Sequence, residues 1–287
     1  MGRRAVVTIV RHGETDHNKA GIIQGHLDVP LNAEGEAQAA VASRWFRANG
    51  VHFDQAWSSD LSRARKVRLA ARWLLLSRRI GGGSHPPPGE LTFLTLWLAR
   101  RFVQTAQIIL EQQKDSVELK QDERIRERHL GNLQGRRRGD PGTDPRTVEP
   151  IPQLRGRLFA FWDSLFPSSS SSSSVPATTS SDLQGEPTQI LYVSHGAAIR
   201  EFVSALIQDR PDTYEVALPK EEEEALRNGS KRIDNCSRTV VEMEEVDGLD
   251  ARGRKWRGRL VLYADDSHFA ESSRAPSPTA NADVVDE

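Results

Sequence analysis

Residues 5–13 have the sequence AVVTIVRHG, and this stretch decides the fold class. Residues 5–10 are apolar or β-branched, so they predict a short buried β-strand. The strand ends where the polar sequence RHG begins, which indicates a loop. Residues 190–193 (ILYV) show the same pattern and run into the sequence SHG. The sequence therefore predicts two strands, each followed by a loop that contains a histidine, His12 or His195.

Segments of helical composition alternate with the predicted strands. Residues 31–49 are rich in alanine and include an N-cap candidate, Asn32, and residues 198–207 have apolar residues at helical spacing. Residues 53–58 form another short predicted strand. Strands that alternate with helices predict an α/β fold with a mostly parallel central sheet. In such sheets functional groups gather beyond the carboxyl ends of the strands, where both histidines are expected.

The composition argues against several classes of protein. The 287 residues include 39 Lys+Arg and 40 Asp+Glu, and the resulting net charge of −1 argues against a general nucleic-acid binder. The single cysteine, Cys236, excludes an intramolecular disulfide and a multi-cysteine zinc site, and it fits a reducing compartment. No apolar run has the length of a membrane-spanning helix, and Arg11 interrupts the N-terminal apolar run. We therefore expect a soluble cytoplasmic protein without nucleic-acid or membrane partners, whose oligomeric state the sequence leaves open.

Two arginines and two histidines are expected to form a cationic pocket. Arg11, His12 and His195 lie at predicted strand ends, and Arg63 follows another strand end in the sequence SSDLSR. Arginine binds phosphate oxygens with two parallel N–H donors, and a neutral, oriented histidine acts as a nucleophile. Because phosphoryl transfer depends mainly on positioning and charge neutralisation, this set of side chains indicates that reaction.

Five segments, in this order along the chain, resemble the histidine phosphatase superfamily. This is the phosphoglycerate-mutase-like group, which also contains fructose-2,6-bisphosphatases. The segments are residues 7–18 (VTIVRHGETDHN), 23–28 (IQGHLD), 58–65 (SSDLSRAR), 126–135 (RERHLGNLQG) and 192–196 (YVSHG). The resemblance implies a three-layer α/β/α sandwich with a mostly parallel central sheet.

The resemblance also implies a catalytic role for each matching residue. His12 matches the nucleophile that becomes phosphohistidine. Arg11, Arg63 and His195 match the groups that hold the transferring phosphoryl group. Glu127, in the sequence RERH, matches the general acid that protonates the leaving oxygen and later activates water.

Further matches concern the substrate. The resemblance implies that Asn18, Gln24, Gly25 and Gly196 contact it. No metal and no cofactor is expected, because two arginines and a histidine can neutralise the phosphoryl oxygens. The sequence also contains no spaced cluster of Cys, His or carboxylate residues typical of a metal site.

Phosphatases and mutases of this group share the core motifs, so the choice depends on other residues. Leu130 stands where phosphoglycerate mutases have a tyrosine, and Arg138 stands where they have a lysine. Residues 140–149 lack the paired arginines and proline-rich stretch of the mutases. We therefore predict a phosphomonoesterase that acts on a small phosphorylated metabolite such as a sugar phosphate. Mutase-type phosphoryl transfer and an inactive module that binds phosphorylated ligands or a protein partner remain the alternatives.

A single histidine-phosphatase domain is expected over residues 1–269, with two interruptions and a tail. Residues 168–181 are rich in serine and predict a flexible surface loop, and residues 270–287 predict a disordered tail. Residues 67–104 contain GGG and PPP beside the apolar patches LAARWLLL and LTFLTLWLARRF. That mixture is typical neither of a helix nor of a loop.

We interpret residues 67–104 as the translation of a retained intron. Joining Lys66 to Thr105 restores SSDLSRARKTAQIIL, which matches the continuation expected for the family and has helical character. The codons at the two ends of the segment permit splice donor and acceptor sequences. Exposed apolar patches without an evident function are an aggregation hazard, which favours this interpretation. The alternative is a genuine insertion looped out on the surface.

Overall fold

The computed structural model describes residues 2–64, 105–113, 115–137, 140, 145–167, 185–246, 248 and 255–270. In this part of the chain seven strands form one sheet in the order β3-β2-β4-β1-β6-β7-β5. The strands are β1 (Arg4–Arg11), β2 (Gln55–Ser58), β3 (Leu119–Gln121), β4 (Thr188–Ser194), β5 (Tyr214–Val216), β6 (Arg238–Glu245) and β7 (Trp256–Asp265). The helices are α1 (Asp16–Ala20), α2 (Ala33–Ala48), α5 (Thr105–Glu111), α6 (Ile151–Leu165), α7 (Gly196–Asp209) and α8 (Lys220–Arg227). Short 3₁₀ helices are η1 (Glu123–Ile125), η2 (Gly131–Leu133), η3 (Pro145–Thr147) and η4 (Ser267–Phe269).

The centre of the sheet is parallel, and this brings the two predicted histidine loops together. β4 pairs with β1 and with β2 in parallel, and β3 extends the sheet beyond β2. In the register of β1 and β4, Arg11 lies opposite Ser194. His12 and His195, each one residue further along, therefore leave the sheet at the same edge. On the edge of β1 opposite to β4, β6 pairs antiparallel with β1, and β7 pairs antiparallel with β6.

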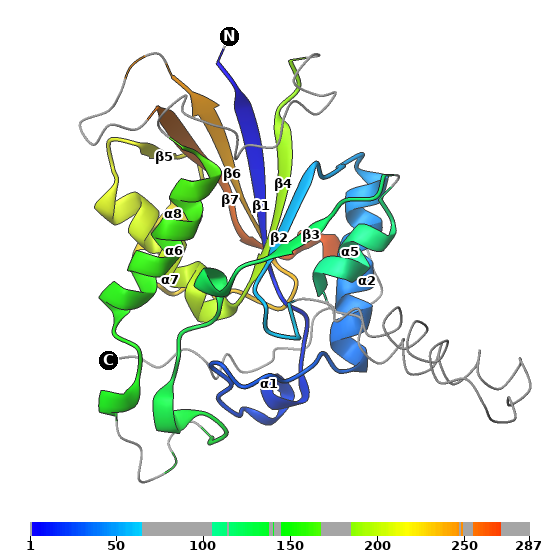
Figure 1. The fold of residues 1–287 in the computed structure, drawn as a ribbon, viewed down its shortest axis with the longest axis vertical. Helices are drawn as coiled ribbons and strands as arrows, with labels where there is room; N and C mark the ends of the chain where they lie inside the picture. The colour runs from blue at the N-terminus through cyan, green and yellow to red at the C-terminus, as the bar shows by residue number, and fades with distance from the viewer. Residues whose placement is uncertain are drawn as a thin grey trace, which may run out of the picture.

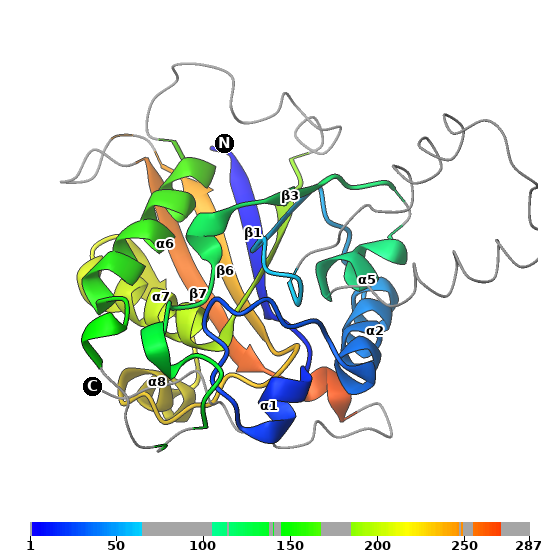
Figure 2. The same cartoon turned by 60° about the horizontal axis from the view of Figure 1, so that its bottom comes forward.

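Helices cover both faces of the sheet, which confirms the predicted three-layer α/β/α sandwich. Figures 1 and 2 show α2 and α5 on one side of the sheet and α6 and α7 on the other. Each face has its own apolar core: α2 and α5 pack through residues such as Phe46 and Ile109, and α6 and α7 through Trp162 and Phe202. Among the described residues, no helix has the length and apolar character needed to cross a membrane.

The predicted elements lie where the sequence patterns place them. The apolar run at residues 5–10 forms most of β1, and residues 190–193 form the centre of β4. Asn32 caps α2, because its side chain accepts a hydrogen bond from Gly35 N at 2.9 Å. The predicted helix at residues 198–207 is the central part of α7.

The two predicted interruptions and nearly all of the predicted tail fall outside the described residues. These are residues 67–104, the serine-rich residues 168–181 and the tail, of which only Ala270 is described, next to η4. Thr105, the first described residue after residues 67–104, begins α5.

Candidate active site

His12 follows β1 directly, and its neighbours fix which ring nitrogen is available. Its backbone N–H donates to Ser194 O at 3.0 Å, and its carbonyl accepts from Asn235 Nδ2 at 2.8 Å. His12 Nδ1 lies 2.7 Å from Gly13 O, which only accepts, so Nδ1 carries the proton. The Nε2 lone pair is then available for attack on phosphorus.

The electrostatic environment keeps this imidazole neutral. Burial lowers the pKa of His12 well below its ordinary value, and the positive charges of Arg63 and Arg11 lower it further. Arg63 Nε donates to His12 Nε2 at 3.3 Å, which also requires an unprotonated Nε2. His12 is therefore in the protonation state that a nucleophile needs at neutral pH.

Arg63 is fixed against His12 by the loop that contains Gly25. Its Nη2 donates to Gly25 O and its Nη1 to Leu27 O, both at 2.8 Å. Gly25 has a positive φ of 50°, and a Cβ there would lie 2.3 Å from Gln134 Oε1. Glycine is therefore required at this turn, and the turn supplies the carbonyls that orient the arginine.

His195 completes a compact group of cationic and imidazole side chains. Its ring centroid lies 5.2 Å from that of His12. Burial lowers the pKa of His195 well below its ordinary value, with a further contribution from the charge of Arg63. Its two buried ring nitrogens have no hydrogen-bond partner in the described part of the chain. Arg11 is buried beside His12, with Nη1 donating to Ile233 O at 2.6 Å.

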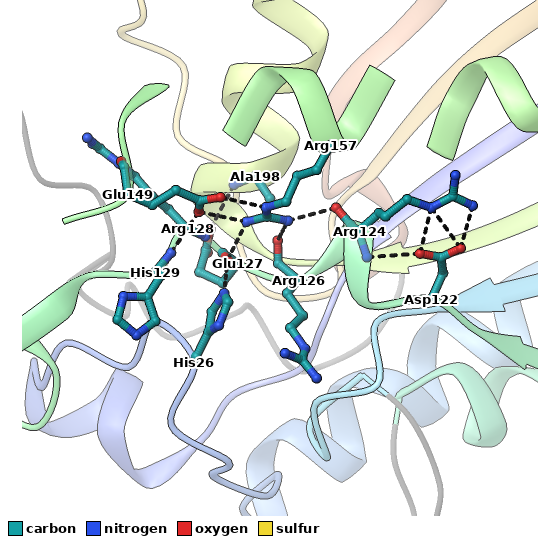
Figure 3. Close-up of polar contacts among 10 residues, drawn as sticks. All are labelled: His26, Asp122, Arg124, Arg126, Glu127, Arg128, His129, Glu149, Arg157 and Ala198. Carbon is teal, nitrogen blue, oxygen red and sulfur yellow. Dashed lines mark hydrogen bonds and ion pairs between the residues drawn. The ribbon is translucent and has the colours of Figure 1, made fainter. Parts of the chain in front are cut away.

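Glu127 reaches the same edge of the sheet from the segment after η1. Its carboxylate accepts hydrogen bonds from Ala198 N at 2.8 Å, from Ala197 N at 3.1 Å and from Arg128 N at 2.9 Å. Ala197 and Ala198 lie in the first turn of α7, whose N-cap is His195; Figure 3 shows Glu127 beside Ala198. Glu127 therefore occupies the N-terminus of α7, where the helix dipole favours a negative charge.

The predicted substrate-contacting residues lie on the loops around this group. Thr15 Oγ1 lies 2.9 Å from Gln24 Oε1 and 3.1 Å from Asn18 Oδ1, and it caps α1. Asn18 Nδ2 is buried and has no hydrogen-bond partner among the described residues. Gly196 is the first residue of α7. An unsatisfied buried donor is costly unless a ligand or water accepts from it, so Asn18 is suited to bind an anion.

The structure thus brings Arg11, His12, Arg63 and His195 together and places Glu127 beside His195. Sequence reasoning did not identify several residues that position them. Asn235 holds the His12 carbonyl, Thr15 links Asn18 with Gln24, Gln134 contacts the Gly25 turn, and Thr105 joins the loops of His12 and Arg63. Asn235 lies in the sequence DNCS, which indicates only the start of a strand.

Thr105, which follows residues 67–104, is hydrogen-bonded to Arg63, which precedes them. Its hydroxyl accepts from Gly13 N at 2.9 Å and donates to Arg63 O at 3.1 Å. If Lys66 were joined to Thr105, this threonine would stand at position i+4 from Arg63. A helical threonine commonly donates to the carbonyl at i−4. The observed bond is therefore the one expected in an uninterrupted helix.

Deletion of residues 67–104 is expected to leave an active and more stable enzyme. The structure already holds Arg63 and Thr105 together, so a shorter connection lowers the entropy cost of closure. We expect the free energy of unfolding to rise by roughly 2 kcal/mol, with activity equal to or above that of the full chain. Denaturant unfolding and phosphatase assays of both forms measure this.

Sequencing of the mature transcript tests the origin of the segment. A message without the codons for residues 67–104 supports the retained intron. A message that contains them, together with lower activity after deletion, would show that the segment belongs to the functional protein.

The chain is similar in sequence to known proteins. The family model of the histidine phosphatase superfamily (branch 1) matches residues 7–72 and 99–168, and residues 73–98 fall between the two matched ranges. The chain is 48% identical over 59 residues to the broad-specificity phosphatase YOR283W of Saccharomyces cerevisiae, a match that covers 21% of this chain and 26% of that protein. It is 28% identical over 264 residues to the fructose-2,6-bisphosphatase TIGAR of Xenopus tropicalis, covering 77% of this chain and 82% of that protein.

A solved structure shares the fold. The mycobacterial glucosyl-3-phosphoglycerate phosphatase superposes with a TM-score of 0.52 at 21% identity, covering 91% of this chain and 98% of that chain.

Proposed function

Because the chain belongs to the histidine phosphatase superfamily, we propose that it hydrolyses phosphate monoesters of small metabolites through a phosphohistidine on His12. The family relationships confirm the sequence-based prediction of a histidine-dependent phosphatase. One observation supports the role of His12 above all others. Its Nδ1 is held as a donor to Gly13 O, so Nε2 presents a lone pair beside the guanidinium of Arg63.

In the first step, His12 Nε2 attacks the phosphorus atom and the ester P–O bond breaks. The negative charge of the bound phosphate ester, next to Glu127, favours the protonated carboxyl group during this step, and Glu127 gives that proton to the leaving oxygen, so that an alcohol departs rather than an alkoxide. Arg11, Arg63 and His195 bind the non-bridging oxygens, whose charge they neutralise in the transition state. Before the attack, substrate binding lets Arg63 exchange its contact with His12 Nε2 for one with the phosphoryl group, which frees the Nε2 lone pair.

In the second step, water hydrolyses the phosphohistidine. The carboxylate of Glu127, ionised after the first step, accepts a proton from the attacking water. The P–N bond breaks, inorganic phosphate leaves and His12 becomes neutral again. Each group then has the protonation state with which it began, including Glu127, which has recovered its proton.

Leu130 favours hydrolysis over mutase-type transfer. It is fully buried and packs with Ile23 and Leu133 at the position where the mutases have a tyrosine. An apolar side chain turned into this cluster offers no hydroxyl to a phosphoglycerate. The names of the relatives support a phosphorylated metabolite such as a sugar phosphate as substrate, and the single cysteine supports a cytoplasmic location.

A panel of phosphorylated metabolites, assayed for release of inorganic phosphate, tests this function. We expect release from at least one sugar phosphate, and no formation of 2-phosphoglycerate from 3-phosphoglycerate. Formation of 2-phosphoglycerate without phosphate release would establish the mutase instead. Binding of phosphorylated ligands without any turnover would establish a binding module.

A further inference from the structure

Arg157, on α6, divides its N–H donors between the segment around Glu127 and the carboxylate of Glu149. Nη1 donates to Arg124 O and to Arg126 O, and Nη2 donates to Glu127 O, each at 2.7 Å. The remaining donors go to the carboxylate of Glu149, from Nε at 2.7 Å and from Nη2 at 2.9 Å. A guanidinium has five N–H groups, so Arg157 is fully satisfied by these five bonds (Figure 3).

Glu149 extends the same contacts to the other side of Glu127. Its Oε2 accepts from His129 N at 2.9 Å, and its carbonyl accepts from Arg128 Nε at 2.8 Å. The Arg157–Glu149 pair therefore holds the carbonyls of Arg126 and Glu127 and the N–H of His129, two residues further on. His26 adds a donor, because its Nε2 lies 2.7 Å from Glu127 O.

The pair is largely shielded from water, with side-chain exposures of 18% for Arg157 and 7% for Glu149. Burial alone would raise the pKa of Glu149, but the hydrogen bonds and charge of Arg157 lower it overall. Glu149 is therefore ionised and keeps the guanidinium in place. Removal of one partner leaves the other as an uncompensated buried charge.

We propose that Arg157 is a positioning residue for Glu127, a role that rests on the proposed function of Glu127 as the leaving-group acid. Two sets of bonds fix Glu127: the N–H groups of α7 hold its carboxylate, and Arg157 holds its backbone. Arg157 thereby connects α6 to the residue that donates the proton. Because a misplacement of about 1 Å costs roughly 100-fold in rate, loss of this anchor impairs proton transfer to the leaving group.

This role differs from a purely structural one in its dependence on the leaving group. An alkoxide needs a proton to leave, whereas 4-nitrophenolate leaves without one. A variant that only weakens the fold lowers kcat/KM for both kinds of ester equally. A variant that misplaces Glu127 lowers kcat/KM for the alkyl ester selectively.

The test compares kcat/KM for 4-nitrophenyl phosphate with that for the best alkyl monoester of the metabolite panel. The variants are Arg157→Met, Arg157→Lys, Glu127→Gln and the double variant Arg157→Met/Glu127→Gln. Arg155→Met is the matched control, because Arg155 lies on the same helix and pairs with Glu201 and Asp209 instead. Thermal unfolding of every variant measures stability alongside activity.

We expect Arg157→Met to lose on the order of 100-fold for the alkyl ester and less than about threefold for the aryl ester. Lysine has three donors in place of five, so Arg157→Lys should recover part of the loss. In the Glu127→Gln background, Arg157→Met should have little additional effect. Arg155→Met should stay within about twofold of wild type.

Equal losses for both esters in folded Arg157→Met, or additive losses in the double variant, would overturn the proposal. If Arg157→Met does not fold, Arg157→Lys and Glu149→Gln are assayed in the same way, and equal losses for both esters there have the same meaning. Failure of the proposed function gives a different result: in that case Glu127→Gln lowers kcat/KM equally for the alkyl and aryl esters.

Discussion

His12→Ala is expected to abolish phosphatase activity, with a decrease in kcat on the order of 10⁴-fold or more. His12 Nε2 is the atom proposed to bond phosphorus, and alanine leaves no atom that replaces it. Arg63 would lose the contact with Nε2 but keep its bonds to Gly25 O and Leu27 O. The phosphate-binding groups therefore stay in place while the chemistry stops.

The fold should survive this substitution, because the backbone of His12 makes the bonds that anchor the loop. These bonds join its N–H to Ser194 O and its carbonyl to Asn235 Nδ2. His17→Ala, in the neighbouring helix α1, is the matched control and should retain activity. Quenching turnover of the wild-type enzyme should trap acid-labile phosphate on His12. Trapped phosphate on His195, or activity in His12→Ala near the wild-type level, would contradict the assignment.

The sheet and its functional edge follow from sequence pattern because they depend on local physics. The apolar run before Arg11 has few alternatives to a buried strand, and the same is true of the run before His195. Parallel pairing of two such strands then places both histidines at one edge. Helix α2 follows equally from its alanine-rich sequence and its asparagine cap.

The residues that position the site were not predictable in this way. Asn235 and His12 are separated by 223 positions, and their hydrogen bond exists only because β6 pairs with β1. Arg157 appears in sequence as an ordinary polar residue of an amphipathic helix. Its five bonds depend on how α6 packs against the segment after η1, and no spacing rule contains that information. The same is true of Thr105, whose partner Arg63 lies across the long interruption.

Glu127→Gln is expected to separate the two chemical steps. Glutamine retains one of the two oxygens that accept from Ala197 N and Ala198 N, but it has no acidic proton to give to a leaving oxygen. We expect kcat/KM for alkyl phosphates to fall by about 10²–10⁴-fold, the usual contribution of general acid catalysis. For 4-nitrophenyl phosphate, kcat/KM should change little. Glu123→Gln is the matched control, since Glu123 lies in the same segment with its side chain 76% exposed.

Rapid mixing with 4-nitrophenyl phosphate then tests the second role of Glu127. Phosphoryl transfer to His12 needs no acid for this substrate, so Glu127→Gln should release one equivalent of 4-nitrophenol rapidly. Hydrolysis of the phosphohistidine needs a base, so the following turnovers should be slow. A burst and an accumulated phosphoenzyme would therefore assign both roles to one carboxylate. Equal losses in kcat/KM for aryl and alkyl esters, without a burst, would instead mean that Glu127 only positions the substrate.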